Sequence, residues 1–176
     1  MSGASRTARP QRSPGVTLPP FQRVLDEHRD DVHRFLVATA GPNEADDCFQ
    51  ETFLAALRAY PRLRPDSNVR GWLLTIAHRK AIDAHRGRGR RAVPVAEVDR
   101  GGVEDPVPRG VGDDPELWDR VRALPQKQRA AVVLRYVADL SHAEAAEVIG
   151  CSEDAARRSL HEALSKLRKD TPDDPQ

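Results

Sequence analysis

The sequence predicts an all-α protein of two small helical domains joined by a flexible linker. Apolar residues recur at steps of three and four over most of the chain, and no alternating strand pattern of useful length occurs. Residues 93–115 hold four glycines and four prolines in 23 positions, a composition that neither continues a helix nor buries a core. We therefore expect helical domains at 19–92 and 116–170, with a disordered basic arm at 1–18 and a short tail at 171–176.

Two helices open the N-terminal domain. The first begins after Pro19 and Pro20 and ends at Gly41. The second has Asn43 as its candidate N-cap and ends at Pro61. Apolar or weakly polar side chains mark the inward stripe of the first helix: Phe21, Leu25, His28, Val32, Phe35 and Thr39. The corresponding stripe of the second helix is Phe49, Phe53, Ala56, Leu57 and Tyr60.

A third helix begins near Ser67 or Asn68 and runs to about Arg86, where the sequence RGRGRR is expected to end it. Between Arg79 and Arg91 there are six basic residues and one acid, Asp83. Helical spacing places Arg79, Asp83 and Arg86 on one face, in line with Trp72 and Ile76. Basic side chains beside an aromatic suit a nucleic-acid backbone with an unstacked base. A solvated helix end that complements the helix dipole is an equal alternative, and Trp72 by itself favours a core position.

The C-terminal domain is expected to begin with a short helix at 116–123, stopped by Pro125, and a longer one that ends near Val137. Ser141 and Glu144 then form the S-x-x-E capping box of a third helix. Gly150 closes that helix.

A helix-turn-helix is predicted over 141–168. Ser152 caps its second helix, which exposes Arg157, Arg158 and His161 near its N-terminal half, the part that enters a major groove. An ordinary helical hairpin with solvated arginines is the alternative.

The acidic start of the second helix, residues 43–53, has two open interpretations. Acids in a first turn are favoured by the helix dipole, so a structural role suffices for each one. Together they also form an acidic, partly aromatic face that could dock a basic partner helix.

Charge is arranged in blocks that the net value of +1 conceals. Residues 1–20 carry three arginines and no acid, whereas the linker at 93–115 carries two basic and six acidic residues. Such asymmetry suggests a partner surface.

Several classes of protein are excluded or disfavoured. No run of roughly 18 apolar residues exists, so membrane insertion is not expected, and no apolar signal segment follows the basic N-terminus. Cys48 and Cys151 are too few for a disulfide framework and match no zinc spacing. No phosphate-binding loop or hydrolase motif occurs. We expect a cytoplasmic protein that is not an enzyme and needs no cofactor, metal or small-molecule substrate.

Three motifs in order give a resemblance. EADDCFQETFLAALR, NVRGWLLTIAHRKAIDAHR and the segment from LPQKQR to LSKLR resemble the core-binding, promoter-melting and helix-turn-helix parts of the extracytoplasmic-function (ECF) sigma factors of bacterial RNA polymerase. The resemblance covers residues 21–92 and 116–169. It implies a sigma region 2 bundle and a sigma region 4 helix-turn-helix. It also implies three partners: core polymerase, promoter DNA and an anti-sigma factor.

The resemblance assigns three sets of residues. Contacts with the clamp helices of the largest polymerase subunit fall to Asp46, Asp47, Gln50, Glu51 and Phe53. Minus-ten DNA contacts fall to Trp72, His78, Arg79, Lys80, Asp83 and Arg86. Minus-thirty-five DNA contacts fall to Ser152, Arg157, Arg158 and His161.

The chain departs from the family pattern at a few positions. Arg79 and Lys80 stand where Asn and Leu are common, which is expected to shift the minus-ten interaction toward phosphates. Ala145 and Ala156 replace larger apolar residues, so a looser C-terminal core is expected. A stand-alone helix-turn-helix regulator that dimerises on a palindrome remains an alternative function, as does a protein-binding adaptor.

Overall fold

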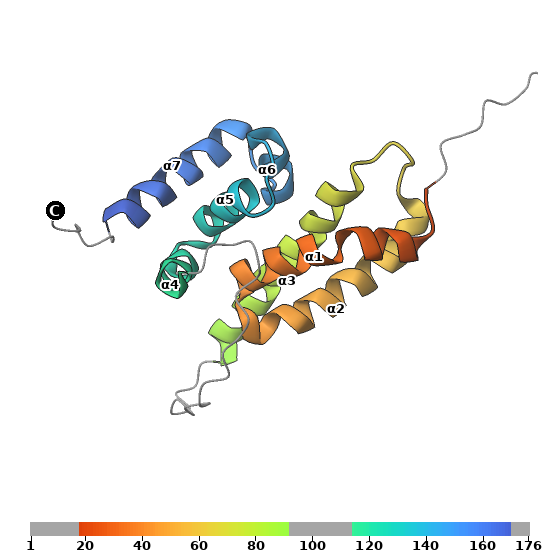
Figure 1. Ribbon diagram of the computed structural model, residues 1–176, viewed down its shortest axis with the longest axis horizontal. Helices are drawn as coiled ribbons and strands as arrows, with labels where there is room; N and C mark the ends of the chain where they lie inside the picture. Colours follow the sequence, from red (N-terminus) through yellow and green to blue (C-terminus); the bar gives the residue numbers. More distant parts are fainter. Residues whose placement is uncertain (1–17, 92–113, 170–176) are drawn as a thin grey trace, which may run out of the picture.

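The computed structural model describes residues 18–91 and 114–169, and within these ranges the chain is all α-helical, as predicted (Figure 1). The helices are α1 (Phe21–Ala40), α2 (Pro42–Ala59), α3 (Val69–Arg91), α4 (Pro115–Ala123), α5 (Gln126–Tyr136), α6 (His142–Ile149) and α7 (Glu153–Lys169), with a short 3₁₀ turn at Tyr60–Arg62. None of the described helices is long and apolar enough to cross a lipid bilayer.

Helices α1, α2 and α3 pack as a bundle around large apolar side chains. The side chains of Phe35, Leu36, Leu73 and Leu74 are fully buried there. Gly41 separates α1 from α2 at a φ of 90°, a left-handed value that glycine adopts without strain. Because one residue makes this turn, α2 folds back directly along α1 (Figure 1).

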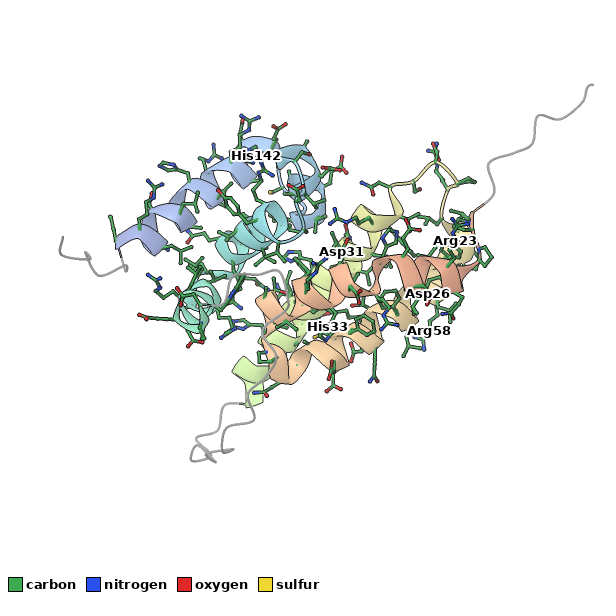
Figure 2. The ribbon with its side chains drawn as sticks, in the orientation of Figure 1. Arg23, Asp26, Asp31, His33, Arg58 and His142 are labelled. Carbon is green, nitrogen blue, oxygen red and sulfur yellow. The ribbon has the colours of Figure 1, made fainter. Side chains whose placement is uncertain are left out.

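Asp31 fastens α1 to α3. Its carboxylate pairs with Arg34 on its own helix and accepts a hydrogen bond of 2.8 Å from Arg70 on α3. Burial raises the pKa of Asp31, but the hydrogen bonds and charges of Arg70 and Arg34 outweigh burial and leave the pKa below its ordinary value. Figure 2 shows Asp31 on the side of α1 that faces α3, and His33 on the side that faces α2.

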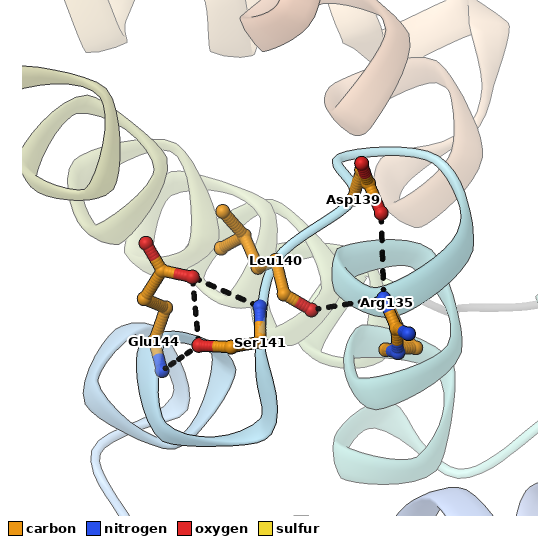
Figure 3. Close-up of polar contacts among 5 residues, drawn as sticks. All are labelled: Arg135, Asp139, Leu140, Ser141 and Glu144. Carbon is orange, nitrogen blue, oxygen red and sulfur yellow. Dashed lines mark hydrogen bonds and ion pairs between the residues drawn. The ribbon is translucent and has the colours of Figure 1, made fainter.

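Helices α4 to α7 form the C-terminal domain, and its helix-turn-helix is built as expected. Ser141 Oγ accepts from the Glu144 N–H at 3.2 Å while the Glu144 carboxylate accepts from the Ser141 N–H at 2.9 Å, which completes the capping box (Figure 3). Gly150 then ends α6 in the left-handed conformation, with φ 77°. This turn sets α7 across α6.

The two domains are packed against each other. Helices α4, α5 and α6 lie against α1 and α3, while α2 and α7 lie on opposite outer sides (Figure 1). One apolar cluster runs through both domains, from Phe35 and Leu73 to Val133, Leu134 and Val148. This docking was not foreseen from the sequence, which indicated only that a linker separates the domains.

The element boundaries differ from expectation at three points. Helix α2 begins at Pro42, so Asn43 lies inside the helix and is not its cap; proline suits the first position because its missing N–H has no partner to lose. Helix α3 continues to Arg91 and does not end near Arg86. Asp114, assigned to the linker, caps α4 by accepting from the Leu117 N–H at 3.1 Å.

Pro115, also assigned to the linker, is the first residue of α4. The remaining residues expected in the basic arm, the linker and the tail lie outside the described ranges, apart from Leu18.

Candidate nucleic-acid and protein interfaces

The outward face of α2 carries four of the residues predicted to bind a partner protein. Asp46, Asp47, Gln50 and Glu51 are all exposed. Two of these acids make contacts with neighbouring helices: Asp46 lies 3.1 Å from Nε2 of His33 on α1, and Glu51 lies 3.0 Å from Nζ of Lys80 on α3. Two of the four side chains therefore contact the helices behind α2.

Phe53 does not belong to this face, which corrects its assignment as a contact residue. It is 6% exposed and packs on Phe49, with 4.8 Å between ring centroids, and on Phe21. Helical periodicity explains the difference, because Phe49, Phe53 and Ala56 share the inward stripe. Phe53 therefore packs inside the bundle and is not exposed beside the acids.

Two leucines on the outward face were missed as candidate contacts. Leu54 is 53% exposed and Leu57 is 50% exposed. Leu57 had been placed in the inward stripe, but it lies at the edge of that stripe and faces solvent. The spacing of Asp47, Gln50, Leu54 and Leu57 at steps of three and four was the available signal, since it defines a single outward row. We call Asp47, Gln50, Leu54 and Leu57 the α2 outer row.

The predicted minus-ten residues on α3 do not all share one face. Arg79, Asp83 and Arg86 are exposed together, as their spacing predicted. Lys80 turns toward α2 and pairs with Glu51. It therefore ties two helices together and is not part of the exposed basic face.

His78 is buried, which corrects its assignment to an open DNA-binding surface. It is 5% exposed, and its ring lies 6.4 Å from the ring of Phe35. Burial and, second, the charge of Arg79 lower its pKa from 6.5 to about 4, so the imidazole is neutral at neutral pH. A small cavity beside it is lined from both domains, by residues that include Thr39, Gln126 and Arg129.

Trp72 lies at the edge of the core and faces a cleft between the domains. It is half-buried, with 6.3 Å between its ring centroid and that of Tyr60. The cleft has a volume of about 280 Å³ and brings Asn68, Trp72 and Thr75 of the N-terminal domain opposite Glu144 and Glu147 of α6. Trp72 thus packs partly against the core, as suggested for it, and leaves part of its ring at the surface.

Helix α7 presents the predicted recognition residues to solvent. Arg157, Arg158 and His161 are exposed, and Ser152 accepts a hydrogen bond of 3.3 Å from the Ala155 N–H at the start of the helix. Glu153, one turn before Arg157, holds the guanidinium in an ion pair at 2.5 Å. The hydrogen bond and charge of Glu153 raise the pKa of Arg157. The inward side of α7 carries Ala156, Leu160 and Ala163.

Two protein-family models match the chain, one in each domain. Residues 24–91 match Sigma-70 region 2, and residues 115–167 match Sigma-70 region 4.

Curated relatives match most of the chain. The probable RNA polymerase sigma-C factor of Mycobacterium bovis is 35% identical over 163 residues, covering 88% of this chain and 85% of that protein. The ECF RNA polymerase sigma factor SigD of Mycobacterium tuberculosis is 34% identical over 84% of this chain and 75% of its own length. SigE of Mycolicibacterium smegmatis is 31% identical, and the chain spans 62% of its length.

The fold is shared with a solved structure. The sigma factor RpoE of Bartonella quintana, crystallised with the anti-sigma factor NepR, superposes with a TM-score of 0.70 at 22% identity, over 85% of this chain and 94% of that one.

Proposed function

Because the chain belongs to the ECF family of bacterial RNA polymerase sigma factors, we propose that it directs promoter recognition and transcription initiation through three separate surfaces. The α2 outer row with its acidic neighbours binds core polymerase. The exposed face of α3 binds the minus-ten element, and the exposed face of α7 binds the minus-thirty-five element. The observation that carries this proposal is that sigma regions 2 and 4 occur in order on one chain, each with a solvent-facing helix of suitable character.

The α2 surface has the composition of a protein-binding site. Leu54 and Leu57 supply an apolar centre, and Asp46, Asp47 and Glu51 supply an acidic rim. A basic helix with an apolar stripe is the complementary partner. The clamp helices of the largest polymerase subunit are the partner that the family resemblance implies.

The two DNA-facing helices use different chemistry. On α3, Arg79 and Arg86 flank Asp83, an arrangement suited to phosphates on either side of an acid that can accept from a base. On α7, Arg158 and His161 can reach base edges in a major groove, while Arg157 is held by Glu153.

The chain carries no chemistry of its own in this proposal, since the polymerase forms the phosphodiester bonds. A protein with these partners acts in the cytoplasm, where the chromosome lies. An anti-sigma factor is a further proposed partner, by likeness to RpoE of Bartonella quintana, which is bound by NepR.

Run-off transcription with core polymerase and a pool of genomic promoter fragments tests the function. The wild-type chain is expected to give discrete start sites, and Leu54→Ala/Leu57→Ala is expected to lose both co-purification with core and those start sites. Tyr136→Ala is the matched control, because Tyr136 is another large exposed side chain, 62% accessible, on the other domain. A wild-type chain that neither binds core nor initiates, but dimerises on a palindrome, would support the regulator alternative instead.

A further inference from the structure

The exposed face of α7 carries an acid as well as basic residues. Glu162 is exposed, next to His161 and one helical turn after Arg158, the two residues proposed to reach base edges. Residues three and four apart on a helix share a face, so Glu162 continues the row that begins at Arg158. A helix that places Arg158 in a major groove therefore brings the Glu162 carboxylate there too.

A glutamine from another helix holds the Glu162 carboxylate. Gln128, near the start of α5, donates from Nε2 to Oε2 of Glu162 at 2.8 Å. The amide oxygen of Gln128 accepts from Nζ of Lys166 at 2.9 Å. Because Lys166 can only donate, it fixes which end of the amide faces Glu162. One carboxylate oxygen is thus anchored, and the other, Oε1, has no protein donor among the residues that the structure describes.

This anchor keeps two opposite charges on α7 apart. Arg157 pairs with Glu153, four residues before it. Arg158 and Glu162 have the same spacing, yet within the described part of the chain no ion pair joins them, and Glu162 bonds to Gln128 instead. The Arg158 guanidinium and one oxygen of Glu162 therefore both stay available to a partner.

The chemistry of the major groove limits what a carboxylate can accept there. Guanine and thymine present no donor in this groove, whereas cytosine presents the N4 amino group and adenine the N6 amino group. The adenine amino group lies between two acceptors, its own N7 and O4 of the paired thymine, and both repel a carboxylate. The cytosine amino group has an acceptor on one side only, O6 of the paired guanine. A carboxylate in the groove therefore favours cytosine.

We propose that Glu162 accepts a hydrogen bond from N4 of a cytosine in the minus-thirty-five element, and that Gln128 is the positioning residue for this contact. The inference rests on the proposed role of α7. Four residues advance a helix by about 6 Å, and base pairs are ~3.4 Å apart. The cytosine therefore lies within about two base pairs of the base that Arg158 contacts.

The sequence selectivity of DNA binding distinguishes this role from a merely tolerated charge. An acid with no donor opposite it repels the phosphates of every duplex, so it lowers affinity for all sequences alike. An acid that pairs with cytosine lowers affinity only for sequences that lack the cytosine. The quantity to measure is therefore the base preference at each position of the site.

Selection of DNA by the full chain gives that preference. The immobilised protein, alone and with core polymerase, is mixed at low salt with duplexes that carry a randomised window, and the retained duplexes are sequenced. The wild type is expected to prefer cytosine over guanine at one position by about tenfold, a ratio typical of a single base contact. Glu116→Gln is the matched control, because Glu116 is an exposed acid on α4, and it should leave every preference unchanged.

Two substitutions at Glu162 should each produce a different base at that position. Glu162→Gln should move the preference from cytosine to adenine, because an amide pairs with both N6 and N7 of adenine. Glu162→Arg should move it to guanine, because a guanidinium donates to both O6 and N7. If both variants kept the wild-type preferences, or bound all sequences more tightly by the same factor, the inference would be overturned.

The positioning role of Gln128 has a separate readout. Gln128→Ala leaves the carboxylate able to pair with Arg158, so the cytosine preference should fall by about threefold, the size of an exposed helical ion pair. The same change in a Glu162→Gln background should alter no preference further, because no carboxylate remains to be positioned. A Gln128→Ala protein that binds every sequence less well by one common factor would contradict the positioning role.

Run-off transcription from templates that carry the selected site separates this inference from the proposed function. A chain that prefers cytosine through Glu162 but does not initiate with core polymerase would refute the proposed function and support the inference. A chain that initiates without any preference that depends on Glu162 would refute the inference alone. A chain that retains no duplex, with or without core polymerase, would overturn both.

Discussion

The two domains build their interiors from side chains of different size. The N-terminal bundle buries Phe35, Leu36, Leu73 and Leu74 completely. The separate core of the C-terminal domain is made of Leu124, Ala131, Val132, Leu160 and Ala163, so two of its five members are alanines. The larger apolar residues of α5, Val133 and Leu134, belong to the cluster shared with the N-terminal domain.

This difference indicates that the C-terminal domain depends on its neighbour for stability. Small domains bury a small fraction of their surface, and a core rich in alanine contributes little apolar area per residue. Docking adds the area that the C-terminal domain lacks. The chain offers a direct probe of this dependence, because its two tryptophans, Trp72 and Trp118, lie one in each domain.

The largest effect is expected at Phe35. Phe35→Ala should destabilise the protein by about 3–5 kcal/mol, because it empties a fully buried position in the shared cluster. Urea unfolding is followed by the fluorescence of the one tryptophan that remains in a Trp72→Phe or a Trp118→Phe background. It should show both domains losing stability. If the Trp118 signal were unaffected, the two cores would be independent and the comparison above would fail.

The next effect is a dependence of stability on pH that comes from His78. Its pKa is about 4 in the folded state against an ordinary 6.5, so the unfolded chain binds the proton more tightly. The stabilisation is fully present above pH 6.5 and is lost as the pH falls toward 4, a change of about 3 kcal/mol.

His78→Gln is the test, with His85→Gln as control, because His85 is exposed on the same helix. The free energy of unfolding of His78→Gln should change less between pH 7 and pH 4.5 than that of the wild type. If the free energy of unfolding of His78→Gln changed with pH as much as that of the wild type, protonation of His78 would not be the source of the pH dependence.

A smaller and more local effect is expected from Leu160→Ala in the C-terminal core. We expect a loss of about 2–3 kcal/mol, at the low end for leucine because neighbouring alanines allow the helices to close up. The midpoint of unfolding reported by Trp118 should move to a lower urea concentration, while the midpoint reported by Trp72 should move less. Equal shifts would mean that the domains unfold as a single unit whichever core is weakened.

The smallest effect is expected at Ser141. Ser141→Ala removes the capping box at the start of α6 and should cost about 1 kcal/mol (Figure 3). Ser141→Asp, which retains a capping oxygen, should restore most of the loss in the same unfolding experiment. If Ser141→Asp lost as much stability as Ser141→Ala, the capping hydrogen bond would not be the source of the stabilisation by Ser141.

Local signals in the sequence were sufficient to predict the helices and the helix-turn-helix. The capping box at Ser141 and the glycine at 150 involve residues three to nine positions apart, so their chemistry is visible in the sequence. The exposure of Arg157, Arg158 and His161 on α7 followed from the same local spacing. The start of α4 was missed because Asp114 and Pro115 were read as linker composition, although together they form an N-cap followed by proline.

The interface between the domains could not be predicted in this way. Arg129 reads as one more basic residue on a helix, and nothing near it in the sequence identifies the Thr39 carbonyl as its acceptor. His78 was assigned to DNA for the same reason, because its burial depends on side chains from a domain that begins more than thirty residues later. On α2 the resemblance assigns contacts to four exposed residues, which stay predictions, and to Phe53, which lies on the buried face of the same helix.

The outward placement of the α2 outer row has a consequence for the order of events. A surface that is always exposed can meet its partner on every productive collision, whereas one that is covered waits for a rearrangement. The free chain can therefore meet a partner protein through the α2 outer row while its two domains stay packed against each other. The rate of that first encounter would then be set by how often the two proteins collide and not by how often the domains separate.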